Sequence, residues 1–218
     1  MSQENTNTGG GKTPATSNGA DKRAAPRFAL LLRGAKLLYP QGEFLCIIRD
    51  VSETGARLKL FHPLPGGDRH FLLEQPSGMR LPAEVIWERD GEAGVRFASA
   101  IDVNQFITEE CPFPRRSLRL NVTSPIMIFA NDLAIPGTLR NISREGAKIE
   151  STVRLSIGQR LRITGQDIPD FEANVCWRKN PDHGVAFRRG MDLADLALIV
   201  ASVNQRGGSD QPPNVDVA

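Results

Sequence analysis

Residues 83–97 read AEVIWERDGEAGVRF, and residues 173–187 read ANVCWRKNPDHGVAF. In each stretch, apolar residues alternate with polar ones on both sides of a turn signal, which predicts a β-hairpin. The two stretches share a Trp, a Gly and a Phe at matching positions, namely Trp87, Gly94 and Phe97 in the first and Trp177, Gly184 and Phe187 in the second. One hairpin therefore occurs twice in the chain.

The repeat extends well beyond this hairpin. DVSETGARLKL, which begins at Asp50, matches NISREGAKIES, which begins at Asn141. Upstream of these, RAAPR at 23–27 matches RRSLR at 115–119. The order is the same in both copies and the spacing nearly so, which indicates a duplicated domain of about 90 residues rather than a short-period repeat.

Each copy contains six short runs with the period of a β-strand. We expect the strands at 28–39, 44–51, 56–61, 69–75, 79–89 and 93–98 in the first copy, and at 119–129, 137–142, 147–152, 159–164, 170–179 and 183–188 in the second. Six short antiparallel strands favour a closed barrel, because closure removes unpaired sheet edges. A helical pattern follows each copy, at 102–110 and 191–205. The fold class is all-β, with two tandem six-stranded barrels, each followed by a helix.

Composition sets the domain boundaries. Residues 1–22 and 206–218 are rich in Gly, Ser, Thr, Asn and Pro, and such segments are typical of disordered tails. Between them lie the first domain at 23–110 and the second at 111–205, which opens with the linker CPFP.

Charge separates the two copies more than the net value of +2 suggests. Residues 23–111 hold 11 Lys and Arg against 12 Asp and Glu, whereas residues 112–190 hold 13 against 7. The second copy is therefore the better candidate for binding an anion.

Other compositional features exclude several classes of protein. No apolar run reaches the roughly 18 residues of a membrane span, and no signal peptide is recognisable. Three isolated cysteines suit a reducing compartment, so we expect a cytoplasmic protein. We find no catalytic constellation and no metal-ligand spacing, and we expect neither enzymatic activity nor a cofactor or metal.

The repeated motifs suit a guanine-bearing anion. Arginine grips a phosphate or the O6/N7 edge of guanine with its planar fork of donors. In the loop that begins at Asp50 or Asn141, a carboxylate or amide oxygen can accept from guanine N1–H and N2–H. The serine of that loop can serve a phosphate or brace the turn, and the glycine permits a positive φ or the close approach of a ligand.

The pattern Arg-x-x-x-Arg, followed by Asp/Asn-x-Ser-x-x-Gly and the segment AEVIW…GVRF, resembles the PilZ domain over nearly all of 23–110 and 115–205. That family is a six-stranded barrel that binds the bacterial second messenger cyclic di-GMP. The resemblance implies two sets of binding residues, which are Arg23, Arg27, Asp50, Ser52 and Gly55 in the first copy and Arg115, Arg116, Arg119, Asn141, Ser143 and Gly146 in the second. The charge of Arg144, inside the loop of the second copy, makes it a further candidate.

The two copies differ inside this motif. Glu53 in the first copy matches Arg144 in the second, and Ala24 matches Arg116. We therefore expect the second domain to bind cyclic di-GMP more tightly. We also expect a downstream protein partner, whose identity the sequence leaves open, and neither membrane nor nucleic acid as a partner. The alternatives are a PilZ barrel that docks on proteins without nucleotide and a small-barrel nucleic-acid binder, for which aromatic residues are sparse near the basic segments.

Overall fold

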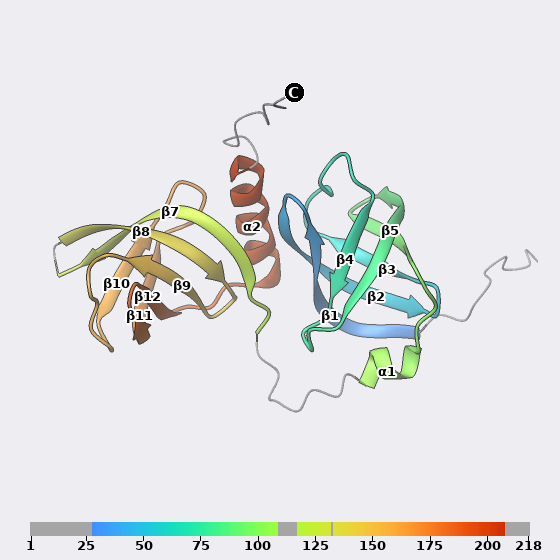
Figure 1. The fold of residues 1–218 in the computed structure, drawn as a ribbon, viewed down its shortest axis with the longest axis horizontal. Coiled ribbons are helices and arrows are strands. Elements are labelled where there is room, and N and C mark those ends of the chain that lie inside the picture. Colours follow the sequence, from blue (N-terminus) through green and yellow to red (C-terminus); the bar gives the residue numbers. More distant parts are fainter. Residues whose placement is uncertain (1–27, 109–116, 132, 208–218) are drawn as a thin grey trace, which may run out of the picture.

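A computed structural model describes residues 28–108, 117–131 and 133–207 of the chain. Within these residues the chain forms two closed six-stranded antiparallel β-barrels, one for each copy in the sequence (Figure 1). The predicted all-β class and the two tandem barrels are confirmed. The expected linker at 111–114 and the expected tail at 1–22 lie outside the described residues.

The first barrel closes because its first strand pairs with its fourth. Its elements are β1 (Phe28–Tyr39), β2 (Gly42–Ser52), β3 (Gly55–Leu60), β4 (His70–Glu74), β5 (Arg80–Arg89), β6 (Glu92–Phe97) and the helix α1 (Val103–Thr108). The ladder runs β1-β2-β3-β6-β5-β4 and returns from β4 to β1. Asp102 caps α1, since its Oδ1 accepts from the backbone N–H groups of Asn104 and Gln105.

The second barrel repeats this topology. Its elements are β7 (Leu120–Ala130), β8 (Leu133–Ile142), β9 (Gly146–Ser151), β10 (Arg160–Thr164), β11 (Phe171–Lys179), β12 (Asp182–Phe187) and the helix α2 (Leu193–Gly207). β8 begins four residues before its predicted start, which the Pro136-Gly137 pair had obscured. A proline is tolerated there because β9 pairs with β8 only as far as Gly137. Asp192 caps α2 through the N–H of Asp195.

Irregularities in the ladders recur in both copies. The pairing shifts between Ile48 and Asp50 in β2 and between Leu139 and Asn141 in β8, just before each Ser-containing turn. It shifts again between Val85 and Trp87 in β5, and likewise in β11. Such bulges bend a strand and re-aim its side chains, so both copies carry the same local distortions beside the same motif.

The tryptophan of each repeated hairpin lies across the glycine of the next strand. A Cβ at Gly94 would fall 2.1 Å from Trp87 Nε1, and a Cβ at Gly184 would fall 1.9 Å from Trp177 Nε1. The Trp–Gly pairing seen in the sequence is therefore a packing requirement, because no larger residue fits under either indole ring.

The helix α2 lies between the two barrels (Figure 1). It contacts β7 of the second barrel and β2 of the first. Leu45 of β2 belongs to the hydrophobic cluster of the second barrel, whereas Ala201 of α2 belongs to that of the first. Buried apolar residues therefore cross between the barrels in both directions, and α2 joins them instead of ending the second one.

Membrane-spanning helices and metal-ligand clusters are both absent from the described residues. None of their helices has the length and apolar character needed to cross a membrane. They also contain no group of three or more His, Cys, Asp or Glu side chains placed to hold a metal ion.

Candidate functional site

The serine of each repeated motif stabilises the turn in which it lies. Ser52 Oγ donates to the carbonyl oxygen of Gly55 at 3.2 Å, and Ser143 Oγ donates to that of Gly146 at 3.0 Å. Both serines are buried. Of the two roles that the sequence left open for the serine, bracing the turn is therefore the one seen in the structure.

The glycine of the motif is required because the backbone of a neighbouring strand lies very close to it. A Cβ at Gly55 would lie 2.2 Å from the carbonyl oxygen of Val95, and a Cβ at Gly146 would lie 2.2 Å from that of Val185. Neither glycine has a backbone in the left-handed region. The neighbouring strand, β6 or β12, therefore excludes a side chain at this position. This reason differs from the two that the sequence suggested, a positive φ and the close approach of a ligand.

The two barrels differ in charge at the first motif position, which is Asp50 in the first barrel and Asn141 in the second. Asp50 is 7% exposed, and its Oδ2 accepts from Arg57 Nε at 2.7 Å. Asn141, the matching residue, is half-buried, and its Oδ1 is shielded from solvent without a hydrogen-bond partner in the described part of the chain. An unsatisfied buried acceptor costs about 1–3 kcal/mol until a donor reaches it. Asn141 Oδ1 is therefore a shielded acceptor without a partner in the described part of the chain, and Asn141 itself does not line the groove of the second barrel.

A groove of about 700 Å³ opens beside the motif turn of the second barrel. Its lining brings Arg119 together with Ser143 and Gly146, and adds the exposed ring of Trp177. The complete lining is Ser117, Arg119, Ser143, Glu145, Gly146, Ala147, Cys176, Trp177, Gly184, Val185 and Ala186. A cationic fork, an indole surface and backbone groups thus share one concave surface, which suits a planar ligand that carries negative charge.

Arg144 connects the motif turn to Met191, in the segment that precedes α2. Its Nε donates to the carbonyl oxygen of Met191 at 3.0 Å, and the N–H of Met191 donates to the carbonyl oxygen of Arg144 at 2.9 Å. Arg144 is not among the residues that line the groove. Glu53, its match in the first barrel, accepts through its backbone carbonyl from Ile101 in the same way.

The strand that follows Arg119 lies directly against the motif. Asn121 of β7 is the register partner of Asn141, and Leu120 is the partner of Ile142. Arg119, which immediately precedes β7, and Asn141 of β8 therefore belong to neighbouring strands. Four other predicted site residues lie outside the described residues, namely Arg23, Arg27, Arg115 and Arg116.

Sequence reasoning missed Trp177 as a groove residue. Strict alternation from the buried Val175 would turn Trp177 inward, but the bulge between them leaves its side chain 40% exposed. Its match, Trp87, is less exposed and lies under the guanidinium of Arg89, 5.1 Å from the ring centroid. A bulge has no reliable signature in one sequence. The signal available was an unusual one, a Trp repeated in a chain that holds only two.

Comparisons with known proteins agree with the duplicated architecture. The family model described as PilZ domain matches residues 21–110 and 113–205. The comparison with curated proteins gave no match.

Three solved structures illustrate the likeness. The chain is similar to PlzA of Borreliella burgdorferi in complex with c-di-GMP, with 10% identity, a TM-score of 0.34, and coverage of 79% of this chain and 87% of that one. For the inhibitor of motility MotI/DgrA of Bacillus subtilis the values are 11%, 0.35, 84% and 100%. For YcgR of Escherichia coli in complex with c-di-GMP they are 11%, 0.28, 82% and 83%.

Proposed function

The chain belongs to the PilZ domain family, and from this premise we propose that it is a non-catalytic receptor for cyclic di-GMP. The observation that carries the proposal is the groove of the second barrel, where Arg119, Trp177 and the motif turn meet. The receptor would consist of the domains 23–110 and 111–205, and a downstream protein would respond to the bound state.

The chemistry of each group in the second barrel suits one part of the dinucleotide. The guanidinium of Arg119 can hold a phosphate, or the O6 and N7 atoms of guanine, with two parallel hydrogen bonds. The exposed face of Trp177 can stack on a purine. The unpartnered Oδ1 of Asn141 can accept from guanine N1–H or N2–H. Arg115 and Arg116 would add further cationic contacts from the segment before Arg119.

The first barrel would hold a second, weaker site, built from Arg23, Arg27 and the turn with Asp50, Ser52 and Gly55. Its weakness follows from the ion pair between Asp50 and Arg57, which a ligand would have to disturb before using that carboxylate. Arg57 Nη1 also lies 3.5 Å from Glu92 Oε2, so the arginine is already neutralised from two sides.

The duplication offers a matched pair of variants for testing the proposal. In calorimetric titrations of the full chain with cyclic di-GMP, Arg119→Ala should weaken the tight site by about 1.5–3 kcal/mol, because a hydrogen bond to a charged group is lost. That loss corresponds to about a 10- to 150-fold change in Kd. The equivalent change Arg27→Ala should affect only the weaker site.

Arg162→Ala provides the control, because Arg162 is an exposed arginine of the second barrel that pairs with Asp170 outside the groove. Its titration should match that of the wild type. GTP and single-stranded RNA should fail to displace cyclic di-GMP. Unchanged affinity in both Arg119→Ala and Arg27→Ala would refute the assignment, as would preferential binding of RNA.

A further inference from the structure

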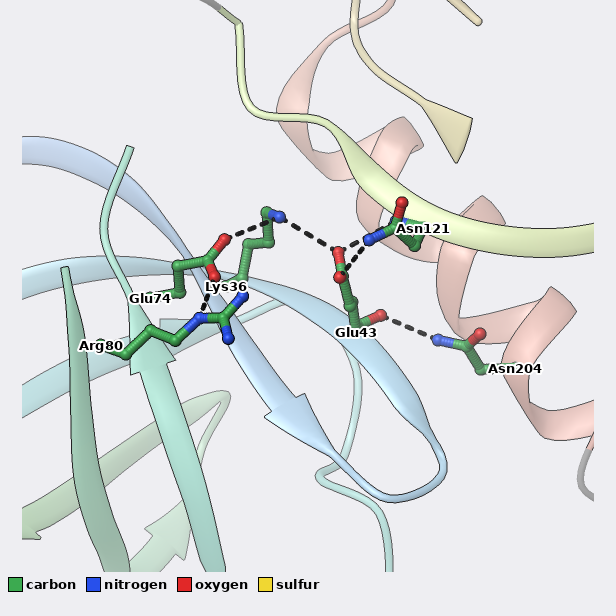
Figure 2. Close-up of polar contacts among 6 residues, drawn as sticks. All are labelled: Lys36, Glu43, Glu74, Arg80, Asn121 and Asn204. Atoms are coloured by element: carbon green, nitrogen blue, oxygen red, sulfur yellow. Dashed lines mark hydrogen bonds and ion pairs between the residues drawn. The ribbon is translucent and has the colours of Figure 1, made fainter. Parts of the chain in front are cut away.

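Glu43 stands at the junction of the two barrels, and it belongs to the first. Its carboxylate accepts from Asn121 of the second barrel twice, from the backbone N–H to Oε2 at 2.9 Å and from Nδ2 to Oε1 at 2.6 Å (Figure 2). Its backbone carbonyl accepts from Asn204 Nδ2 of α2 at 2.8 Å. One residue of the first barrel is thus hydrogen-bonded to both β7 and α2.

The carboxylate of Glu43 is held in place from its own side as well. Lys36 Nζ lies 3.2 Å from Glu43 Oε2 and 2.8 Å from Glu74 Oε1, and Glu74 pairs in turn with Arg80 (Figure 2). The side chain of Glu43 is 17% exposed and that of Lys36 is 12% exposed. Hydrogen bonds to a charged group are stronger than those between neutral groups.

Residues that contact the first barrel lie on both sides of Arg119 in the sequence. Asn121 is two residues after Arg119, and Leu118 immediately precedes it. Leu118 packs closely over Gly34 of β1, where an added Cβ would lie 2.9 Å from its Cδ1. Leu118 and Asn121 are therefore both fixed against the first barrel, and the register of Asn121 with Asn141 extends this restraint to the motif acceptor.

The two copies diverge at these contact positions. By ladder register, Asn121 corresponds to Ala29, Glu43 to Ala134, Gly42 to Leu133 and Gly34 to Pro125. Gly42 leaves room for α2, because a Cβ there would lie 2.6 Å from Asn204 Cγ. A duplicated fold needs none of these residues for its own barrel, since the other copy folds without them, so their identities serve the junction.

We propose that Glu43 is a positioning residue for the groove of the second barrel, so that the first barrel sets the affinity of the second for cyclic di-GMP. The inference rests on the proposed function. Glu43 itself would not contact the ligand. It fixes the backbone of β7 at Asn121. This restraint holds Arg119, two residues earlier, in the groove, and it holds Asn141 of β8 in its pairing with Asn121. Preorganising these groups removes part of the ordering cost of binding.

The test is a titration of the full chain with cyclic di-GMP, comparing the wild type, Glu43→Ala and Glu172→Ala. Glu172 is the control because it forms one exposed ion pair, with Arg188, on the second barrel. We expect the tight site of Glu43→Ala to weaken about tenfold, within the range of coupling between sites, and Glu172→Ala to match the wild type. Glu43→Gln keeps an acceptor for the N–H of Asn121 and should recover part of the affinity.

Two additional measurements separate positioning from a general loss of structure. Asn121→Ala should weaken binding less than Glu43→Ala does, because the backbone N–H of residue 121 can still donate to Glu43. The double variant should be no weaker than Glu43→Ala alone, because Glu43→Ala already removes both hydrogen bonds. Amide hydrogen exchange should become faster at Asn121 in Glu43→Ala, with the β11–β12 hairpin unchanged. Accelerated exchange throughout the second barrel would instead assign Glu43 a purely structural role and overturn the inference.

The outcomes for function and for positioning are distinguishable. If the wild type binds cyclic di-GMP and Glu43→Ala binds it equally well, the positioning role is refuted and the proposed function stands. If the wild type does not bind cyclic di-GMP at all, the proposed function fails and this inference fails with it.

Discussion

Gly146 has a structural role that is separate from the ligand binding proposed for its motif. The space for a Cβ is filled by the carbonyl oxygen of Val185, 2.2 Å away, which is backbone and has little room to move. Gly146→Ala should therefore force β9 and β12 apart and lower the free energy of unfolding by about 1–3 kcal/mol. Thermal and urea denaturation followed by circular dichroism would measure the loss.

Gly66→Ala is the matched control for this change. No atom lies within 4 Å of a Cβ built on Gly66, and its backbone is outside the left-handed region, so its stability should equal that of the wild type or exceed it slightly. If Gly146→Ala retained full stability and lost only ligand affinity, the strand-contact explanation would be wrong, and the glycine would be needed for the ligand instead.

At the scale of elements, β1, β4 and β5 are joined by the charged chain of Lys36, Glu74 and Arg80. Burial by itself raises the pKa of Glu74, but hydrogen bonds from Lys36 and Arg80 outweigh it and bring the pKa below the usual 4.5. A folded-state pKa below the unfolded one means that the ionised form stabilises the fold. This stabilisation is complete above the unfolded pKa and disappears as the pH falls through the folded one.

The free energy of unfolding as a function of pH provides the measurement. We expect Glu74→Gln to be less stable than the wild type at pH 7, and the difference between the two proteins to shrink steadily below pH 4.5. Glu84→Gln, which alters an exposed ion pair with Arg96 in the same barrel, should show a smaller difference at neutral pH. A difference that stayed constant down to pH 2 would contradict the role assigned to Glu74.

The strands themselves were predictable because alternation reports directly on a barrel with one face inward. In β7, for example, buried and exposed residues alternate almost without a break, so its limits were predicted to within one residue. The position of Trp177 was not predictable, since a bulge shifts the alternation by one residue and leaves no mark in composition. Sequence periodicity therefore predicted the barrels, but it could not predict that the indole of Trp177 is exposed in the groove.

At the scale of the whole molecule, the duplication predicted two barrels but not how they join. The pattern of α2 predicted a helix with one apolar face, and it could not tell which barrel that face would cover. Ala201 belongs to the core of the first barrel, although α2 follows the second in the chain. Contacts such as that of Asn204 with Glu43 span 161 residues, and no local pattern encodes them.

This arrangement predicts that one substitution in α2 separates the barrels. Ala201 is 4% exposed against the first barrel, so Ala201→Arg would bury a charge and a long side chain in a space sized for a methyl group. The barrels should then undock, which small-angle X-ray scattering would report as a larger radius of gyration. Leu198→Arg is the control, because Leu198 lies on the same helix with 52% of its surface exposed, and the scattering of this variant should match that of the wild type.

The undocked protein should also lose affinity at the proposed tight cyclic di-GMP site, to about the extent expected for Glu43→Ala, since both changes release β7 from the first barrel. If the radius grew while the affinity stayed the same, the second barrel would bind its ligand independently, and docking would serve the downstream partner instead.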